Sequence, residues 1–272
     1  MSKVLTSSNK FLMSGGRWLT RDSSGPSLPP YTIRLRYMDG VTPTFNRGTA
    51  VQVSSSPNIW DLTYEHYKWN ALLYQHATLL EVIEANTTGV SNMTDLFSDC
   101  YSLTSVPLFD TSSVTNMSYM FRYCYFLTSV PLFDTSSVTS MQGTFQSCQT
   151  LTTVPLFDTS SVTDMTQMFA SCSRLTSVPL FDTSSVTTMQ EMFFDCSSLT
   201  SIPLFNTSSV TDMFGMFYMC SNVENGALAL YQQASSQAIV PDHSRTFYNC
   251  GAKTVTGAAE LAQIPDDWKN QL

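Results

Sequence analysis

A stretch of eight residues, LFDTSSVT, returns every 24 positions along this chain and limits the folds open to it. The stretch begins at residues 108, 132, 156 and 180, and a fifth copy at 204–211 carries Asn206 in place of Asp. A fixed period between 20 and 50 residues is typical of solenoids, propellers and other arrays of stacked units. Six cysteines keep the same 24-residue step: Cys100, Cys124, Cys148, Cys172, Cys196 and Cys220.

Within each unit, large apolar side chains recur at a helical spacing. In the stretch MSYMFRYC at residues 117–124, the Met, Met, Phe and Cys stand at i, i+3, i+4 and i+7, which is one face of a helix. Thr115 is the expected N-cap, and the next unit supplies a capping-box pair in Thr139 and Gln142. The sequence therefore predicts a short helix over about 116–124.

A short strand is expected after each helix. The segment LTSVPL at residues 103–108 has the LxxLxL spacing of a leucine-rich-repeat strand. Pro107 has no N–H to donate to a ladder, so the strand should end near Val106, and DTSS should form the following turn. The predicted fold class is an α/β repeat, a leucine-rich-repeat solenoid of roughly seven to eight coils with parallel strands and one buried file of cysteines.

Diverged coils are expected at both ends, because end coils must cover an otherwise open core. Residues 66–89 overlay the repeat, with Trp69 and His76 at core positions. Forward of Cys220 the register breaks, and an insertion that contains residues 226–237 intervenes. HSRTFYNC at 243–250 then restores the helix end and LAQIP at 261–265 restores the strand end. The predicted solenoid covers 66–265, and 266–272 is a C-terminal tail.

The front of the chain has a different pattern. Residues 31–45 alternate apolar and polar side chains up to the Asp39-Gly40 turn, and TAVQVSSS and NIWDLTY predict two further short strands. We expect 31–65 to form a small N-terminal β cap.

Residues 1–30 show no period and are rich in Ser, Gly and Pro. They form either a flexible tail or a docking peptide that orders on a partner, and disordered linkers seldom carry large apolar residues. The apolar points of such a docking peptide are Phe11, Leu12, Trp18 and Leu19.

The unit VTNMSYMFRYCYFLTSVPLFDTSS resembles the BspA-like leucine-rich repeats, in the variant found in mycoplasma lipoproteins, gut-bacterial surface proteins and phage-encoded proteins. The resemblance covers 90–222 closely and 66–89 and 243–265 more loosely. It implies a binding or adhesive role and not an enzyme. No signal or lipid-attachment sequence is present, unlike in the secreted members, which favours a phage structural protein released by lysis.

Charge and composition exclude several classes of function. The net charge is −8, which gives no electrostatic support for nucleic-acid binding. No apolar stretch is long enough for membrane insertion. The cysteines lack the close pairs of a metal site, and stacked in parallel they would not face one another as disulfides do, so we expect a ladder of buried free thiols. No cofactor motif or catalytic arrangement appears.

An aspartate also repeats every 24 residues, and two roles are open to it. Each carboxylate either accepts N–H bonds within its own turn, which we favour, or contributes to a divalent-cation site. The members of this ladder are Asp110, Asp134, Asp158 and Asp182.

The units differ mainly at helix positions away from the Met/Phe/Cys face. Either these positions drift on a solvated surface, or they form a recognition surface, because exposed aromatics rimmed by polar residues suit glycan or protein binding. The candidate binding residues gather in two groups. The first is Tyr101, Tyr119, Arg122, Tyr123, Tyr125 and Phe126, and the second is Phe194, Phe214 and Tyr218 with Met219.

The sequence thus favours a non-catalytic binding protein, a phage virion fibre or decoration protein made in the host cytoplasm. It would contact a protein or glycan on a host surface through its repeats and bind other virion proteins through its N-terminus. Both a monomer and a homo-oligomer are open from the sequence. The alternative is a bacterial cell-surface adhesin of the BspA type.

Overall fold

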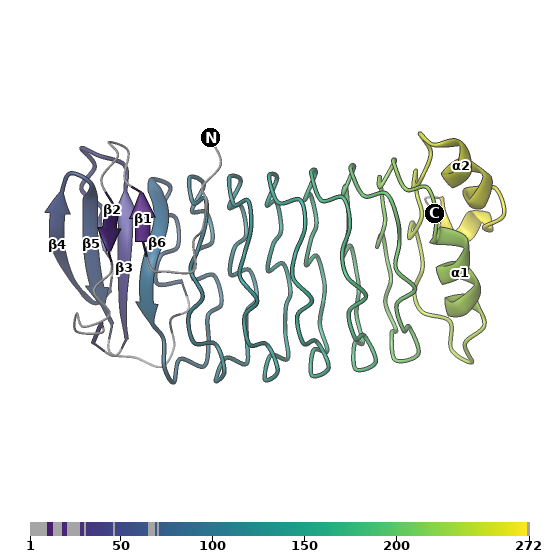
Figure 1. Cartoon of the computed structure of the whole chain (residues 1–272). Coiled ribbons are helices and arrows are strands. Elements are labelled where there is room, and N and C mark those ends of the chain that lie inside the picture. The colour runs from purple at the N-terminus through teal and green to yellow at the C-terminus, as the bar shows by residue number, and fades with distance from the viewer. Residues whose placement is uncertain are drawn as a thin grey trace.

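The computed structural model shows a row of stacked coils between a β-sheet at the N-terminal end and two helices at the C-terminal end (Figure 1). The coils lie side by side along a nearly straight axis. The structure describes residues 10–12, 18–20, 28–29, 31–45, 47–64, 69 and 71–270.

The N-terminal end is a four-stranded antiparallel sheet. Strands β3 (Thr32–Tyr37), β4 (Thr49–Ser55), β5 (Asn58–Thr63) and β6 (Leu79–Asn86) lie in the order β4-β5-β3-β6. Strands β3, β4 and β5 are the three that the sequence pattern predicts. Their inward side chains build the start of the core, where Ile33, Leu35 and Leu62 are fully buried.

Strand β6 joins the sheet to the coils. It pairs antiparallel with β3 on one side, while Glu81 forms a parallel bridge with Ser105 of the next coil on the other. The Thr104 N–H donates to the carbonyl of Leu80 at 3.0 Å. The sheet therefore extends beyond the predicted boundary at residue 65, because the strand of the first coil is also its fourth strand.

Residues 1–30 contain structure that the sequence pattern did not predict. Strands β1 (Lys10–Leu12) and β2 (Trp18–Thr20) pair antiparallel, with Phe11 opposite Leu19 and Leu12 opposite Trp18. Leu28 is buried, and its carbonyl accepts a hydrogen bond from Asn86 Nδ2 at 2.9 Å. The side chains of β1 and β2 lie outside what the structure describes, so the docking role of Phe11, Leu12, Trp18 and Leu19 stays a prediction.

The predicted helix in each coil is wrong. Over 90–225, a range that the structure describes throughout, the coils consist of turns and isolated bridges with no helix. Tyr119 and Tyr123 adopt left-handed backbone conformations, with φ of 58° and 60°, which an α-helix does not allow. The left-handed residues recur at equivalent positions in the other coils, so the MxxMFxxC spacing serves a succession of tight turns instead.

The N–H groups of these turns point alternately within the coil and to the next coil. Tyr119 donates to the carbonyl of Gln142 at 2.7 Å and Phe121 to that of Thr144 at 2.9 Å. Arg122, in contrast, donates to the carbonyl of Tyr119, three residues earlier, at 3.1 Å. This alternation satisfies the backbone without an i→i−4 ladder, which explains why apolar spacing alone misled the prediction.

The expected N-cap is also wrong, because Thr115 bonds between coils. Its N–H and Oγ1 both donate to the carbonyl of Ser91, at 2.9 and 3.2 Å. The cap-like bond is made by the next residue, since Asn116 Oδ1 accepts from the Ser118 N–H at 2.8 Å. The parallel pairing predicted just before Val106 is present in part, as the bridges Glu81↔Ser105 and Ser201↔Asn225. A more regular series of parallel bridges, which the sequence did not predict, recurs at the Asn116 position and includes Asn92↔Asn116, Asn116↔Ser140 and Ser140↔Asp164.

Identical side chains stack on one another through the core. Seven phenylalanine rings form a continuous pile, with neighbouring centroids 5.2–6.0 Å apart: Phe97, Phe121, Phe145, Phe169, Phe193, Phe217 and Phe247. The six predicted cysteines form a buried file of free thiols beside it, as expected. Each thiol donates to a carbonyl of the preceding coil, as Cys124 Sγ does to that of Phe97 at 3.2 Å.

The C-terminal end differs from the predicted coil and tail. The insertion forms α1 (Ala227–Ser235), and LAQIP belongs to the end of α2 (Val255–Leu261) and the turn after it, not to a strand. The 3-10 helix η1 (Asp266–Trp268) places Trp268, which is 3% exposed, against Phe247 at 6.0 Å and His243 at 4.2 Å between ring centroids. Residues 266–270 therefore close the phenylalanine pile and are not a tail.

The repeated aspartates cap their own turns, which is the role favoured from the sequence. Asp110 Oδ1 accepts from the Ser112 N–H at 3.0 Å and from Ser112 Oγ at 2.6 Å. Asn206 accepts from the Ser208 N–H at 3.0 Å in the same way. An amide oxygen is enough for this backbone bond, which explains how the fifth copy can carry Asn.

We predict that the native thiols resist labelling. Burial raises the pKa of Cys172 to about 12, so the reactive thiolate is scarce at neutral pH and the reagent has no access. A colorimetric thiol reagent should therefore label none of the seven cysteines in native protein and all of them in denaturant. Rapid labelling of the native protein would contradict the buried file.

We also predict that the aspartate ladder makes stability sensitive to acid. Hydrogen bonds from Ser112, Ser160 and Ser184 lower the pKa values of Asp110, Asp158 and Asp182 respectively. Their stabilising effect is complete above the unfolded pKa of about 3.9 and is lost as the pH falls through the lower folded values.

The test is a variant in which Asp110, Asp158 and Asp182 are all replaced by Asn. The amide oxygens keep the turn bonds, as that of Asn206 does, but no group that titrates in acid remains at these positions. The melting temperature of this variant, followed from pH 7 down to pH 2, should fall less steeply than that of the wild type. Parallel curves for the two proteins would show that the ladder does not contribute to acid sensitivity.

Candidate binding face

The variable side chains lie on the tight turns of the coils. We call this surface the turn edge, defined as the positions equivalent to Tyr119, Arg122, Tyr123 and Tyr125 in every coil. Tyr119 and Tyr123 are the two left-handed residues of their coil, and all four of these side chains are half-buried. Tyr119, Arg122 and Tyr123, which we expected on the solvent side of the coil, are therefore only partly exposed.

Arg122 organises the first aromatic group. Its guanidinium carbon lies 4.8 Å from the centroid of the Tyr119 ring and 5.4 Å from that of Tyr123, within cation–π range. Its Nη2 lies 3.5 Å from Asp95 Oδ1, and its Nε donates to Ser98 Oγ at 3.2 Å. These contacts fix a long, flexible side chain between two rings.

Tyr101 and Tyr125 extend the same group. Their rings stack with centroids 5.3 Å apart, and Tyr125 lies 6.1 Å from Tyr123. Tyr101 is 39% exposed and Phe126, which follows Tyr125, is 58% exposed. Arg122 thus contacts Tyr119 and Tyr123, Tyr125 and Tyr101 continue the group from Tyr123, and Phe126 is the next residue in the chain.

The next coil makes room for this group. Gly143 occupies the position of Tyr119, and a Cβ there would collide with the Tyr119 ring. Gly143 also has a φ of +57°, which glycine adopts without strain. The Tyr119 ring can therefore pack here only because the equivalent residue of the next coil, Gly143, has no side chain.

A buried carboxylate beside the first group was missed by sequence reasoning. Asp99 is 6% exposed, and its Oδ1 has no hydrogen-bond partner among the described residues. Burial raises the pKa of the nearby Asp95, and Arg122 opposes that shift. The sequence showed Asp99 only as a variable position, because its burial depends on left-handed geometry that the pattern does not reveal.

The second aromatic group is a stack across three coils. The Phe194 and Tyr218 rings lie 4.9 Å apart, and Tyr218 and Tyr248 lie 4.7 Å apart. Arg245 sits 5.8 Å from the Phe214 centroid. Tyr248 was missed, although the overlay of HSRTFYNC on the repeat places it at the Tyr218 position once the insertion is removed.

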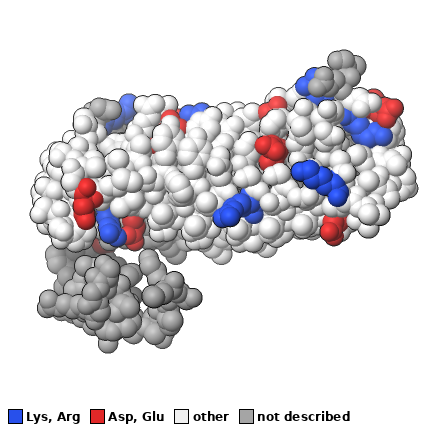
Figure 2. Space-filling view, turned by 90° about the horizontal axis from the view of Figure 1, so that it is seen from above, with Lys and Arg blue, Asp and Glu red and all other residues white. Residues whose placement is uncertain are grey.

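Polar side chains bridge the two aromatic groups. Gln146 Nε2 donates to Gln167 Oε1 at 3.3 Å, and Gln167 Nε2 donates to Glu191 Oε2 at 2.6 Å. The turn edge therefore runs as aromatic, polar and aromatic zones along the stack. Charged side chains are few and scattered on the face of the molecule seen in Figure 2.

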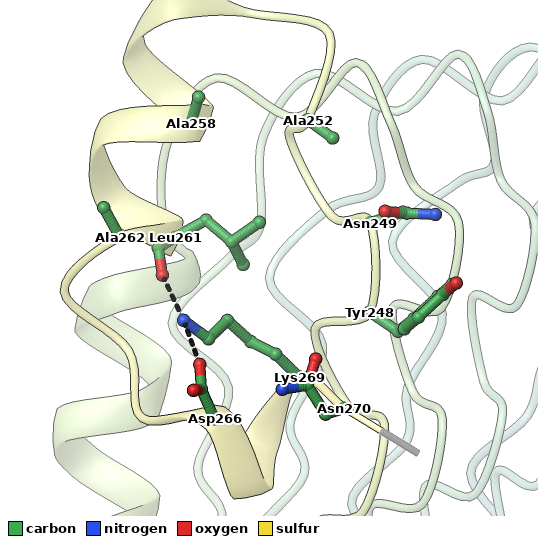
Figure 3. A pocket seen from close by; sticks show the side chains of 9 residues that line it. All are labelled: Tyr248, Asn249, Ala252, Ala258, Leu261, Ala262, Asp266, Lys269 and Asn270. Carbon is green, nitrogen blue, oxygen red and sulfur yellow. Dashed lines mark hydrogen bonds and ion pairs between the residues drawn. The ribbon is translucent and has the colours of Figure 1, made fainter.

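A surface hollow lies at the C-terminal end (Figure 3). Its cation is already paired, because Lys269 Nζ lies 3.1 Å from Asp266 Oδ1 and donates to the carbonyl of Leu261 at 3.2 Å. Alanine and leucine side chains form much of the remaining wall. This arrangement holds the end of the chain together.

Within the described part of the chain, no group of three or more His, Cys, Asp or Glu side chains could hold a metal ion. The described aspartates of the ladder are used by their turns. Among those same residues, no helix is both long and apolar enough to cross a membrane.

A comparison with protein-family models identifies the repeat family. The model of the family described as "Mycoplasma protein of unknown function, DUF285" matches residues 70–155 and 145–254. A comparison with curated proteins found no match. A leucine-rich repeat protein from Eubacterium ventriosum, solved as a crystal structure, is 25% identical with a TM-score of 0.37, over 46% of this chain and 32% of that protein. The family model covers more than half of the chain, so the protein belongs to the DUF285 family of BspA-like repeats.

Proposed function

We propose that the protein is a non-catalytic binding protein and that the turn edge is its recognition surface. The observation that carries the proposal is Arg122, held between the rings of Tyr119 and Tyr123 in an aromatic group that also contains the exposed Tyr101. Membership of a BspA-like repeat family supports a binding or surface role at this coarse level. The leucine-rich-repeat solenoid is the scaffold that we propose for presenting this surface.

The ligand that we propose is an extended glycan on a cell surface. Aromatic rings offer apolar faces with polar rims, and Arg, Asp and Gln offer fixed hydrogen-bonding groups between them. Arg122 and Phe194 stand three coils apart, which is about 14 Å at a coil spacing of about 4.8 Å. A chain of a few sugar units would span both aromatic groups and contact the polar zone between them.

The setting that we propose is a phage virion, in which the protein is a fibre or decoration component. Seven buried free thiols suit a chain that folds in a reducing cytoplasm before its release. The N-terminal residues Phe11, Leu12, Trp18 and Leu19 would attach it to other virion proteins. A bacterial cell-surface adhesin remains the alternative setting for the same binding surface.

We predict that exchanging three turn-edge residues abolishes binding without unfolding the protein. The variant Tyr119→Gln, Arg122→Ala, Tyr123→Ser installs the residues that another coil carries at Gln167, Ala170 and Ser171. Because those residues already fit this backbone, the melting temperature should change by only a few degrees. Tyr and Arg hot spots commonly contribute more than about 1–2 kcal/mol each, so binding should weaken by at least about 30-fold.

The measurement is binding of the purified chain to a glycan array and to intact bacterial cells. Thr153→Ser is the matched control, because the equivalent positions of other coils carry Ser and this site lies outside the turn edge. Unchanged binding by the folded triple variant would rule out the turn edge. Loss of cell binding without any glycan signal would point to a protein ligand on the same surface.

A further inference from the structure

One file of repeated leucines faces solvent, although the LxxLxL spacing would place these side chains in the core. The third leucine of each LxxLxL segment is 53–67% exposed, while the phenylalanine that follows it is buried. Backbone bonds between coils hold equivalent residues about 4.8 Å apart, so these side chains form a straight apolar row. The row consists of Leu108, Leu132, Leu156, Leu180 and Leu204.

Two further files flank this row. On one side lies an exposed threonine file: Thr104, Thr128, Thr152, Thr176 and Thr200. On the other side lies the exposed aspartate ladder, which ends in Asn206. We call the three files together the leucine face, with threonine, leucine and aspartate in that order across it.

We propose that the leucine face is the interface between two copies of this chain. Five coils at about 4.8 Å, and seven residues from 104 to 110 at about 3.3 Å each, outline a surface on the order of 550 Å². Stable interfaces bury roughly 800 Å² per partner, so the face is close to that size. An apolar row of this length is also unusual on a monomer surface and commonly marks an association site.

The spacing of the row argues for an identical partner. Five leucines at one constant interval match, along their whole length, only a surface with the same interval. A second copy supplies that interval automatically, whereas a partner without the repeat would contact one or two leucines well and leave the others exposed. A two-fold arrangement also closes the assembly at a dimer.

Charge determines the relative direction of the two stacks. If the two-fold axis lay across the stack, each aspartate ladder would face the ladder of the other copy, and like charges would oppose one another. If the axis lies parallel to the stack, the aspartates of each copy lie over the uncharged threonines of the other. We therefore place the copies side by side with their N-terminal sheets at the same end, so that Leu108 faces Leu108 of the second copy.

The interface leaves the turn edge free, because the leucine face and the turn edge are different segments of each coil. The dimer would then present two turn edges to one surface, which raises apparent affinity through linked binding. The inference goes beyond the proposed function and does not depend on it, since self-association can be measured without any ligand.

The first test is the mass of the full chain in solution, by sedimentation equilibrium over a range of about 1 to 100 μM, which covers the dissociation constants of weak dimers. The wild type should be a dimer at the upper end. The variant Leu132→Ser, Leu156→Ser, Leu180→Ser should be a monomer, with dimerisation weakened at least about 30-fold. It should keep its melting temperature, because the three side chains are exposed. A monomeric wild type at the upper concentration, or a dimeric variant, would overturn the interface.

The second test examines the direction of the stacks with a short bismaleimide crosslinker. The seven native cysteines are buried, so a single Leu108→Cys substitution provides one reactive thiol. With stacks in the same direction, Leu108→Cys and Leu156→Cys should both crosslink into dimers. With opposed stacks, only the central Leu156→Cys would react, because the two thiols introduced by Leu108→Cys would lie about 19 Å or more apart. Val255→Cys, at a site that is 90% exposed on α2, is the control and should give background crosslinking only.

Discussion

The structure depends on the hydrogen bonds that run from each coil to the next. Tyr119 and Phe121 donate forward to Gln142 and Thr144, while Thr115 donates backward to Ser91. These bonds fix equivalent residues at one constant spacing, so side chains at the copied positions stack on their own kind. Aromatic stacking, the thiol–carbonyl bonds and the exposed leucine row all follow from this single register. The coil that carries α1 is longer than the others, yet Phe247 still stacks on Phe217, because the bridge between Asp212 and Asp242 restores the register.

The 24-residue period could be predicted from the sequence because identical residues recur at that interval. The burial of the repeated cysteines and three strands of the N-terminal sheet could also be predicted. The backbone of the turns was not readable. Met117, Met120, Phe121 and Cys124 fit a helix by spacing, and only the positive φ of Tyr119 and Tyr123 excludes one. Apart from Gly143 and Gly215, the left-handed positions carry ordinary residues, so no local signal marks them.

Burial was predicted well where a side chain faces the interior of a coil and poorly at the edges. Leu108 matches a core leucine by spacing, yet Pro107 interrupts the alternation that would have turned it inward. Trp268 lies in a segment without the period, and its role in closing the phenylalanine pile depends on contacts with His243 and Phe247 that are distant in sequence. For the candidate site, the aromatic residues were predicted, but the buried Asp99 was not.

Copied and varied positions fall on different parts of each coil. The leucine and aspartate files repeat almost without change, which suits an interface that must match a periodic partner. The turn edge changes from coil to coil, between Tyr119 and Gly143 for example, which suits recognition of a ligand that is not periodic at this interval. One scaffold can therefore carry an assembly surface and a recognition surface without conflict between them.

The register between coils is tested most directly by NMR couplings transmitted across hydrogen bonds in a deuterated sample. The account predicts a correlation from the amide nitrogen of Tyr119 to the carbonyl carbon of Gln142, and another from Phe121 to Thr144. It also predicts that Arg122 correlates with Tyr119 within its own coil. Correlations from Phe121 to Met117 and from Tyr123 to Tyr119 would instead show an i→i−4 helix in the coil and would contradict the stacked-turn architecture.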